Sequence, residues 1–178
     1  MDKLIVTSLL KQMLTQNNQS VYEISTKKRV MLVFLRHFGC FFCRETLDEL
    51  SKFFEELSKN NTQLIFVHMS ENQVAEQYFV KYGLNDIQHV SDKECYYYNM
   101  FKLGKATTKQ LLNLQSFIRG FDSAFIKGRG GALPNEKTGD EYQMPGIFII
   151  DNGLITNQFI HKTPSDKPDY NNLIKSQF

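Results

Sequence analysis

The sequence predicts an α/β fold in which a central mixed sheet is flanked by helices. Two observations carry this prediction. Apolar runs that suit buried strands alternate with segments whose apolar residues recur every three to four positions, which is the period of a helix. Near the end of the chain, Asn152-Gly153 separates two strand-like runs, and this dipeptide favours a tight hairpin turn. Strands joined through a helix pair in parallel and a hairpin pairs antiparallel, so we expect a mixed sheet.

Five segments are predicted to form the strands of this sheet, at residues 30–35, 64–69, 87–90, 146–151 and 154–161. The first segment is apolar at every position from Val30 to Leu35, as expected of a strand that helices cover on both faces. A further short segment, residues 21–24, is predicted to be a brief strand or an extended approach to the sheet.

Apolar residues at helical spacing predict the covering helices, at about residues 4–17, 43–59, 70–82, 91–103, 107–118 and 168–175. Gly83 lies where a glycine commonly ends a helix, and Pro168 suits a first helical turn. Residues 120–143 are rich in glycine and charge, which predicts a long loop before the last hairpin. Because no repeat or linker divides the sequence, we expect one domain over residues 1–178, with an N-terminal helical extension.

The composition narrows the classes of function. The formal net charge is +2 and no long basic run occurs, so we expect no nucleic-acid partner. No apolar stretch is long enough to span a bilayer and no secretory signal is recognisable, so we expect no membrane partner. Three cysteines are too few for a disulfide scaffold. This favours a reducing, cytoplasmic setting, where paired cysteines are more often catalytic or metal-binding.

The motif Cys40-Phe41-Phe42-Cys43 is placed where the first predicted strand turns into a helix. The N–H groups and the dipole at a helix start stabilise a thiolate, which makes a cysteine there reactive. Cys40 is therefore the expected nucleophile, with its sulfur partly exposed. Cys43 lies one helical turn further on, close enough to close a disulfide, and is the expected resolving thiol. Two inert core cysteines are the competing interpretation.

Three basic residues could assist Cys40. His37 could donate a hydrogen bond to the thiolate or transfer protons, although a histidine bonded to the backbone is an equally good interpretation. Arg36 is expected to be a solvated charge at the end of the strand. Arg119 could reach back to the thiolate or to a substrate, and the simpler interpretation is a surface charge.

Two aromatic residues separate the cysteines. If the ring of Phe41 or Phe42 is exposed beside the sulfurs, it would suit docking of a hydrophobic segment of a substrate. Cys95, the remaining cysteine, is expected to be a small buried hydrophobe on a helix.

Short pieces of sequence in a fixed order extend the pattern beyond the cysteine motif, at residues 34–40, 43–45, 66–68, 82–84, 90–92 and 143–149. Together with the order of elements, they resemble the thioredoxin fold. More closely, they resemble the peroxiredoxin-like branch of the alkyl hydroperoxide reductase/thiol-specific antioxidant (AhpC/TSA) family. The resemblance implies that the Met144-Pro145 bond is cis and that Pro145 faces the two sulfurs. It also implies that the backbone of Met144 pairs with an extended substrate segment.

The sequence departs from both groups at the motif. Where peroxiredoxins carry a hydroxyl three positions before the reactive cysteine, this chain has His37, and where thioredoxins carry Gly-Pro it has Phe41-Phe42. The resemblance thus implies an antioxidant thiol oxidoreductase in which Cys40 and Cys43 exchange disulfides and reduce hydroperoxides slowly. It implies protein disulfides or small hydroperoxides as substrates, a thiol reductant of the thioredoxin or glutathione type, and no cofactor.

Two other classes of function stay open. One is a non-catalytic thioredoxin-fold binding module, against which the intact Cys40, Cys43 and Pro145 argue. The other is a metal-binding protein, because a Cys-x-x-Cys motif is half of a tetrahedral zinc site. Cys95 and a histidine could supply the missing ligands only if the fold brought them close. The sequence holds no second cysteine pair, so we expect no metal.

Overall fold

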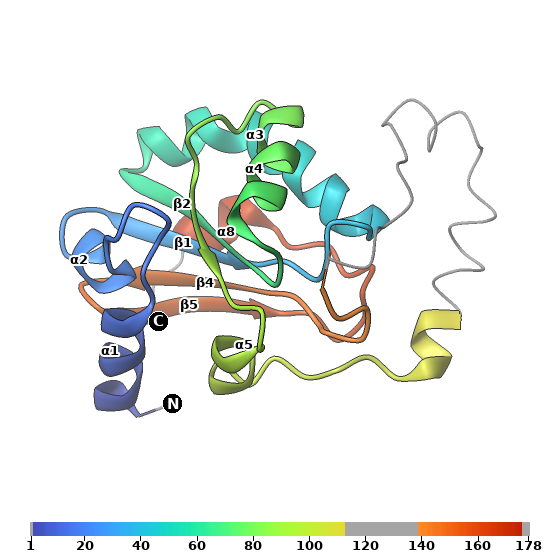
Figure 1. Cartoon of the computed structure of the whole chain (residues 1–178). Helices are drawn as coiled ribbons and strands as arrows, with labels where there is room; N and C mark the ends of the chain where they lie inside the picture. Colours follow the sequence, from blue (N-terminus) through green and yellow to red (C-terminus); the bar gives the residue numbers. More distant parts are fainter. Residues whose placement is uncertain (1, 113–138, 176–178) are drawn as a thin grey trace.

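The computed structural model describes residues 2–112 and 139–175 of the chain, and these centre on a mixed sheet (Figure 1). Its strands are β1 (Arg29–Phe34), β2 (Thr62–His68), β3 (Gln88–Ser91), β4 (Gly146–Asp151) and β5 (Leu154–Ile160). The order across the sheet is β3-β2-β1-β4-β5. β2 runs parallel to β1 and β3, whereas β4 runs antiparallel to β1 and β5. The predicted mixed sheet is confirmed.

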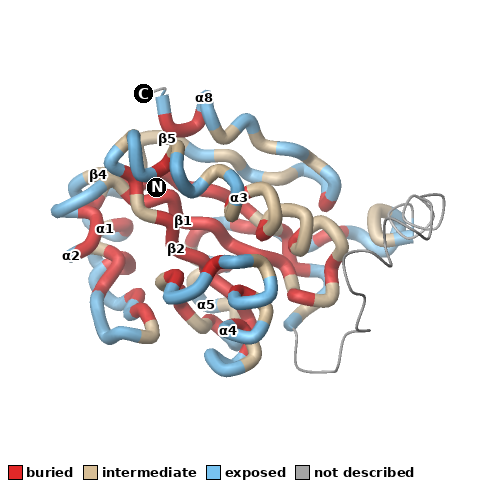
Figure 2. The backbone as a smooth tube through the Cα atoms, turned by 90° about the horizontal axis from the view of Figure 1, so that it is seen from above, coloured by how far each residue is buried: buried red, intermediate tan, exposed pale blue. Residues whose placement is uncertain are grey.

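Helices cover both faces of this sheet: α1 (Lys3–Gln12), α2 (Val21–Ser25), α3 (Phe41–Lys59), α4 (Asn72–Lys81), α5 (Tyr96–Met100) and α8 (Tyr170–Lys175). α3, α4 and α8 lie on one face, and α1, α2 and α5 lie on the other (Figure 1). β1 and β2 are buried along most of their length and lie in the interior of the molecule, while the helices carry many exposed residues (Figure 2). Among the helices of the described residues, none combines the length and apolar character that a bilayer crossing requires.

Strand β1 is apolar from Val30 to Phe34 because both of its faces are covered. Successive side chains of a strand point to opposite faces. Met31 and Val33 therefore pack with the core that α3, α4 and α8 cover, while Leu32 and Phe34 pack with the core beneath α1, α2 and α5. Each core therefore contains apolar side chains from β1, which is why no polar residue occurs from Val30 to Phe34.

Three predicted elements differ from the structure. The prediction of an extended segment at residues 21–24 is wrong, because α2 occupies it. Ser20 and Glu23 form a capping box, each side chain bonding the backbone N–H of the other residue at 3.1 Å, and this starts a helix. α1 ends at Gln12 rather than near residue 17. α5 begins only at Tyr96, because the Asp92 carboxylate accepts the first N–H groups of the helix.

The turn signals are confirmed. Gly83, with φ of +72°, follows the end of α4, and Asn152 and Gly153 form the hairpin turn with φ of +48° and +73°. Residues 108–112 are helical, while the rest of the helix predicted at residues 107–118 lies outside the described residues. Most of the long loop predicted at residues 120–143 lies outside them as well.

The end of β1 is fixed to its neighbours before the chain enters α3. Leu35 donates its N–H to the carbonyl of Val67 at 2.9 Å, which extends the pairing of β1 with β2 by one residue. The hydroxyl of Tyr98, fully buried, lies 2.6 Å from the carbonyl oxygen of Leu35 and 3.0 Å from that of Val67. These contacts position the residues that follow, which carry the cysteine motif.

Candidate functional site

The two cysteines of the motif lie at the start of α3. Cys40 is the N-cap residue of the helix and Cys43 belongs to its first turn. Both are free thiols that do not form a disulfide bond in this structure. The expectation that the sulfur of Cys40 is partly exposed is wrong, because Cys40 is only 5% exposed and Cys43 only 3%. The guanidinium of Arg36 lies against Cys40 and excludes solvent.

Arg36 is the centre of the site. Its backbone N–H donates to Sγ of Cys43 at 3.2 Å, and its Nη1 donates to Sγ of Cys40 at 3.1 Å. The expectation of a solvated arginine is therefore wrong, since the residue is 2% exposed. Nε donates to the carbonyl of Gln143 at 3.1 Å, and Nη2 donates to the carbonyl of Glu141. A buried cation requires such partners, and the negative charge of a thiolate at Cys40 completes the set.

The two thiols are chemically different. The pKa of Cys40 lies well below its ordinary value because Cys43 donates a hydrogen bond and because the Arg36 guanidinium adds positive charge, against the effect of burial. Burial raises the pKa of Cys43 well above its ordinary value, and its interaction with Cys40 raises it further. Cys40 is therefore the more acidic thiol and Cys43 the less acidic one. This is the division that a nucleophile and a resolving thiol need.

His37 lies between the strand and the motif. Its carbonyl accepts the N–H of Cys40 at 2.9 Å, which closes the turn into α3. Burial lowers the pKa of the imidazole, while the neighbouring Cys40 opposes that shift. The ring is therefore mainly neutral at pH 7 and able to donate or accept a hydrogen bond beside the thiol.

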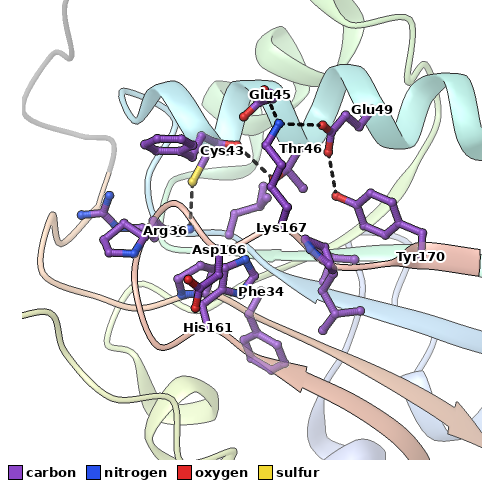
Figure 3. A pocket seen from close by; sticks show the side chains of 17 residues that line it. Phe34, Arg36, Cys43, Glu45, Thr46, Glu49, His161, Asp166, Lys167 and Tyr170 are labelled. Carbon is purple, nitrogen blue, oxygen red and sulfur yellow. Dashed lines mark hydrogen bonds and ion pairs between the residues drawn. The ribbon is translucent and has the colours of Figure 1, made fainter. Parts of the chain in front are cut away.

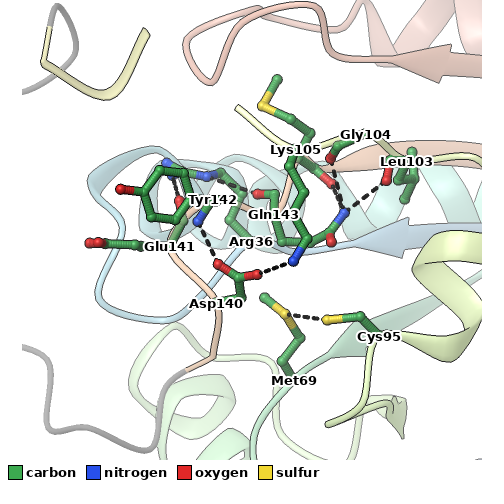
Figure 4. A network of polar contacts seen from close by, with 11 residues as sticks. Arg36, Met69, Cys95, Leu103, Gly104, Lys105, Asp140, Glu141, Tyr142 and Gln143 are labelled. Carbon is green, nitrogen blue, oxygen red and sulfur yellow. Dashed lines mark hydrogen bonds and ion pairs between the residues drawn. The ribbon is translucent and has the colours of Figure 1, made fainter. Parts of the chain in front are cut away.

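A network of polar contacts holds residues 140–144 against the site (Figure 4). The Gln143 side chain is fully buried and donates to the carbonyls of Leu103 and Gly104, each at 3.1 Å. Lys105 pairs with Asp140 at 2.7 Å. These contacts hold in place the segment whose backbone carbonyls accept hydrogen bonds from the guanidinium of Arg36.

The Met144–Pro145 bond is trans, so the expected cis bond is wrong. Met144 is buried and its N–H donates to the carbonyl of Gly104 at 3.0 Å. Its carbonyl accepts from the Gln143 amide at 3.3 Å. The backbone of Met144 is thus engaged within the chain rather than presented to a substrate. Pro145 lines a cavity together with Cys43, whereas Cys40 is not among the residues that line it.

That cavity lies between the start of α3 and the segment that leads into α8 (Figure 3). Cys43, Phe42, Pro145 and Ile147 contribute to its walls. Its polar lining residues are Arg36, Glu45, Thr46, Glu49, His161, Asp166, Lys167 and Tyr170. Of the two cysteines of the motif, Cys43 is the one that lines this cavity.

The aromatic residues in and just before the motif differ in how far they are buried. Phe38 is buried and stacks on Tyr78, with ring centroids 4.7 Å apart. Phe41 and Phe42 are half-buried and meet edge to face at 5.4 Å. The two rings beside the sulfurs therefore keep part of their apolar surface exposed.

Two remaining residues named from the sequence lie elsewhere. Arg119 lies outside the described residues. Cys95 is half-buried, with its sulfur 3.3 Å from that of Met69 rather than at the motif. Over residues 2–112 and 139–175, no group of three or more histidine, cysteine or acidic side chains is placed to hold a metal ion.

Known proteins share the sequence pattern and the fold of this chain. The model of the AhpC/TSA family matches residues 7–158, which include the motif, the segment at Gln143 and the hairpin. The chain belongs to the AhpC/TSA family.

Relatives of this AhpC/TSA protein fall into more than one group. A prostamide/prostaglandin F synthase of Danio rerio is 27% identical over 169 residues, which cover 94% of this chain and 83% of the fish protein. A mitochondrial 2-Cys peroxiredoxin of Plasmodium falciparum has a TM-score of 0.55 at 17% identity, covering 90% of this chain and 82% of its own. A candidate thiol:disulfide interchange protein (DsbE) of Chlorobium tepidum has a TM-score of 0.52 at 14% identity, covering 91% and 88%.

Sequence reasoning missed the most connected residue of this AhpC/TSA site. Arg36 lies four positions before Cys40, and a charged residue that directly follows an apolar strand usually reaches solvent. Its partners, the carbonyls of Glu141 and Gln143, are more than 100 positions away in the sequence. One feature of the sequence could have indicated this role. No acidic residue occurs in β1 or in the turn up to Cys40, so a thiolate at Cys40 is the anion nearest to Arg36 in the sequence.

Proposed function

We propose that this AhpC/TSA protein is a thiol–disulfide oxidoreductase in which Cys40 is the nucleophile and Cys43 the resolving thiol. The observation that carries the proposal is the contact between Arg36 and Cys40. A buried guanidinium 3.1 Å from one sulfur stabilises that sulfur as a thiolate. The second thiol, one helical turn away, stays protonated. Peroxiredoxins and the candidate thiol:disulfide interchange protein share the fold, which supports redox chemistry of this type.

The reaction proceeds in two exchanges. The Cys40 thiolate attacks one sulfur of a substrate disulfide, so that a mixed disulfide forms and the other half of the substrate leaves as a thiolate. Cys43 then loses its proton and attacks the sulfur of Cys40. The Cys40–Cys43 disulfide closes and the remaining half of the substrate leaves. Two electrons pass from the protein to the substrate, and an external thiol has to return them.

Hydroperoxide reduction uses the same first thiol. The Cys40 thiolate attacks the outer oxygen of the peroxide, becomes a sulfenic acid, and the leaving oxygen takes up a proton to give an alcohol or water. Cys43 then condenses with the sulfenic acid and releases water. In this chain Arg36 and His37 are the groups available to orient the peroxide, in place of a hydroxyl. We expect this activity to be slower than disulfide exchange, because the guanidinium already donates to two carbonyls.

A lipid-derived substrate is the second candidate. The fish relative is a prostamide/prostaglandin F synthase, so it acts in forming lipid-derived products. In this chain the half-buried rings of Phe41 and Phe42 offer apolar surface beside the sulfurs. Comparing the rates of Cys40 oxidation by cumene hydroperoxide and by hydrogen peroxide tests this candidate. A faster reaction with the apolar peroxide, lost in Phe41→Ser, supports it, and equal rates count against it.

The test of the first candidate is substrate trapping. Cys43→Ser removes the resolving thiol, so mixed disulfides between Cys40 and protein partners should accumulate and disappear on reduction. Cys40→Ser is the matched control and should trap nothing. If the wild type reduces peroxide at a rate near that of dedicated peroxiredoxins and no partner is trapped, disulfide exchange is not the main activity.

A further inference from the structure

The cavity beside Cys43 has an acidic rim. Glu45, Glu49 and Asp166 contribute three carboxylates to its lining, against the ammonium of Lys167. His161 adds no charge at pH 7, because burial lowers its pKa to about 4. Arg36 also lines the cavity, but its guanidinium is engaged with Cys40 and two backbone carbonyls. The rim therefore complements a positively charged group.

Lys167 indicates where that group would sit. Its Nζ lies 2.9 Å from Oε1 of Glu45 and 3.7 Å from Oε1 of Glu49, so it occupies the space between the two carboxylates (Figure 3). The lysine side chain is 62% exposed, whereas that of Glu45 is 17% exposed. An ion pair with so exposed a partner contributes little stability. The lysine can therefore swing into solvent and leave the carboxylates to another ammonium group.

We propose that this cavity binds a small thiol carrying an ammonium group, and that this thiol reduces the Cys40–Cys43 disulfide by attacking the sulfur of Cys43. The inference rests on the proposed function, since it requires that disulfide to form. The enclosed volume is about 20 Å³ while Lys167 lies across it, which is room for about one water molecule. A ligand enters when the lysine moves out, and the small space favours a compact thiol over a protein segment.

The difference between the two thiols supports attack at Cys43. In thiol–disulfide exchange, the sulfur whose thiol has the lower pKa leaves faster. When the external thiolate bonds to Cys43, the bond that breaks releases Cys40 as a thiolate, and Arg36 is already placed to stabilise it. Attack at Cys40 would instead release Cys43, whose pKa burial raises. The position of Cys43 in the wall of the cavity and the better leaving group, Cys40, thus support the same direction of attack.

The reaction balances with two molecules of the external thiol. The first forms a mixed disulfide with Cys43 and loses its proton, while Cys40 leaves as a thiolate. The second attacks the mixed disulfide, so that the disulfide of the small thiol is released and Cys43 takes up a proton. The two external thiols are oxidised, and the protein disulfide is reduced by the same two electrons.

The experiment uses the full chain, oxidised to the Cys40–Cys43 disulfide, which loss of two hydrogens by mass verifies before mixing. Reduction is followed with cysteamine, 2-mercaptoethanol and 3-mercaptopropionate, which share a two-carbon chain and carry an ammonium, a hydroxyl and a carboxylate group. The rates are corrected for the thiolate fraction and nucleophilicity of each reagent. We expect cysteamine to be about fivefold faster than 2-mercaptoethanol, as expected for one partly exposed ion pair, and 3-mercaptopropionate to be the slowest.

Three variants locate the effect. Glu45→Gln should abolish most of the preference for cysteamine, and Lys167→Met should increase it, because the competing ammonium is gone. Asp48→Asn is the matched control: it removes one negative charge from the same helix but from a pair with Lys52 that lies outside the cavity. We expect Asp48→Asn to leave the preference unchanged. Acid-quenched mass spectrometry should find the first mixed disulfide on Cys43.

Four results would overturn the inference: equal corrected rates for the three thiols, a mixed disulfide on Cys40, an equal effect of Asp48→Asn and Glu45→Gln, or reduction by a thioredoxin-type protein alone. If the Cys40–Cys43 disulfide never forms, the mass measurement shows this before any thiol is added. That result overturns the proposed function, and the inference with it.

Discussion

The guanidinium of Arg36 lies 3.1 Å from the sulfur of Cys40, with both groups buried at the start of α3. Besides the hydrogen bond from Cys43, this cation lowers the pKa of the Cys40 thiol. Replacing Arg36 by Met should therefore raise the pKa of Cys40 and slow its alkylation at pH 7 about tenfold. The pH dependence of the iodoacetamide reaction measures both quantities.

Arg36→Lys is the matched variant, since it retains the charge and loses the fork of donors to Glu141 and Gln143. We expect it to keep most of the pKa shift. Lys93→Met removes an exposed cation elsewhere and should change nothing. An unchanged alkylation profile in Arg36→Met would show that the helix start and Cys43 alone set the acidity of Cys40.

The hydrogen bond from Cys43 is the leading cause of the lowered pKa of Cys40. Cys43→Ala removes the donor and should raise that pKa, whereas Cys43→Ser keeps a hydroxyl donor and should raise it less. Alkylation of Cys40 as a function of pH separates the two variants. Equal profiles for alanine and serine would assign the effect to something other than the hydrogen bond.

The buried imidazoles of His68 and His89 predict a loss of stability in acid. Nε2 of His68 lies 2.8 Å from Nδ1 of His89, and the N–H of Ser70 donates to Nδ1 of His68 at 3.2 Å. Neutral His68 therefore carries its proton on Nε2 and donates it to His89. Burial lowers the pKa of His68 to about 3 and that of His89 to about 4.

Because the folded pKa values lie below the ordinary value of 6.5, the unfolded chain binds more protons at acidic pH. The contribution to stability is complete above pH 6.5 and is lost as the pH falls towards 3. We expect the free energy of unfolding to fall by a few kcal/mol between pH 7 and pH 4. Urea denaturation at both pH values measures it, and His89→Gln should flatten the dependence. An equally steep fall in that variant would point to the acidic residues instead.

Two glycines with the same backbone conformation should respond differently to alanine. Gly83 and Gly153 have φ of +72° and +73°. A Cβ at Gly83 meets nothing within 4 Å, whereas one at Gly153 would lie 2.5 Å from the ring of Tyr22. Gly83→Ala should cost about 1–2 kcal/mol of stability for the backbone conformation.

Gly153→Ala should cost more than Gly83→Ala, because the Tyr22 ring has to move as well. Equilibrium urea denaturation of both variants gives the comparison. Equal losses would mean that the tyrosine ring adjusts freely.

The sequence predicted most of the fold because its signals are local. β1 is apolar at each position that faces a core, and the Asn152-Gly153 turn carries its own conformation. The segment at residues 21–24 was predicted wrongly, since its apolar residues suit a strand and the capping box of Ser20 and Glu23 decides for a helix.

The site was predicted less completely, because its contacts join distant residues. The placing of Cys40 and Cys43 follows from the strand–helix boundary. The burial of Arg36 depends on the backbone carbonyls of Glu141 and Gln143. Every residue has a backbone carbonyl, so the sequence does not indicate which of them will accept a hydrogen bond. The cavity beside Cys43 depends on Lys167 and His161, whose proximity to α3 results from the path of the chain after β5.

The hydrogen bonds between Arg36 and the carbonyls of Glu141 and Gln143 have a consequence for folding during synthesis of the chain. The ribosome delivers Arg36, Cys40 and Cys43 about a hundred residues before Glu141 and Gln143, whose carbonyls hold the guanidinium. A nascent chain that ends short of residue 141 therefore carries both thiols without the groups that orient their cation. The full set of hydrogen bonds of Arg36 can therefore form only after residue 143 has been added, when the strands β1, β2 and β3 have already been synthesised.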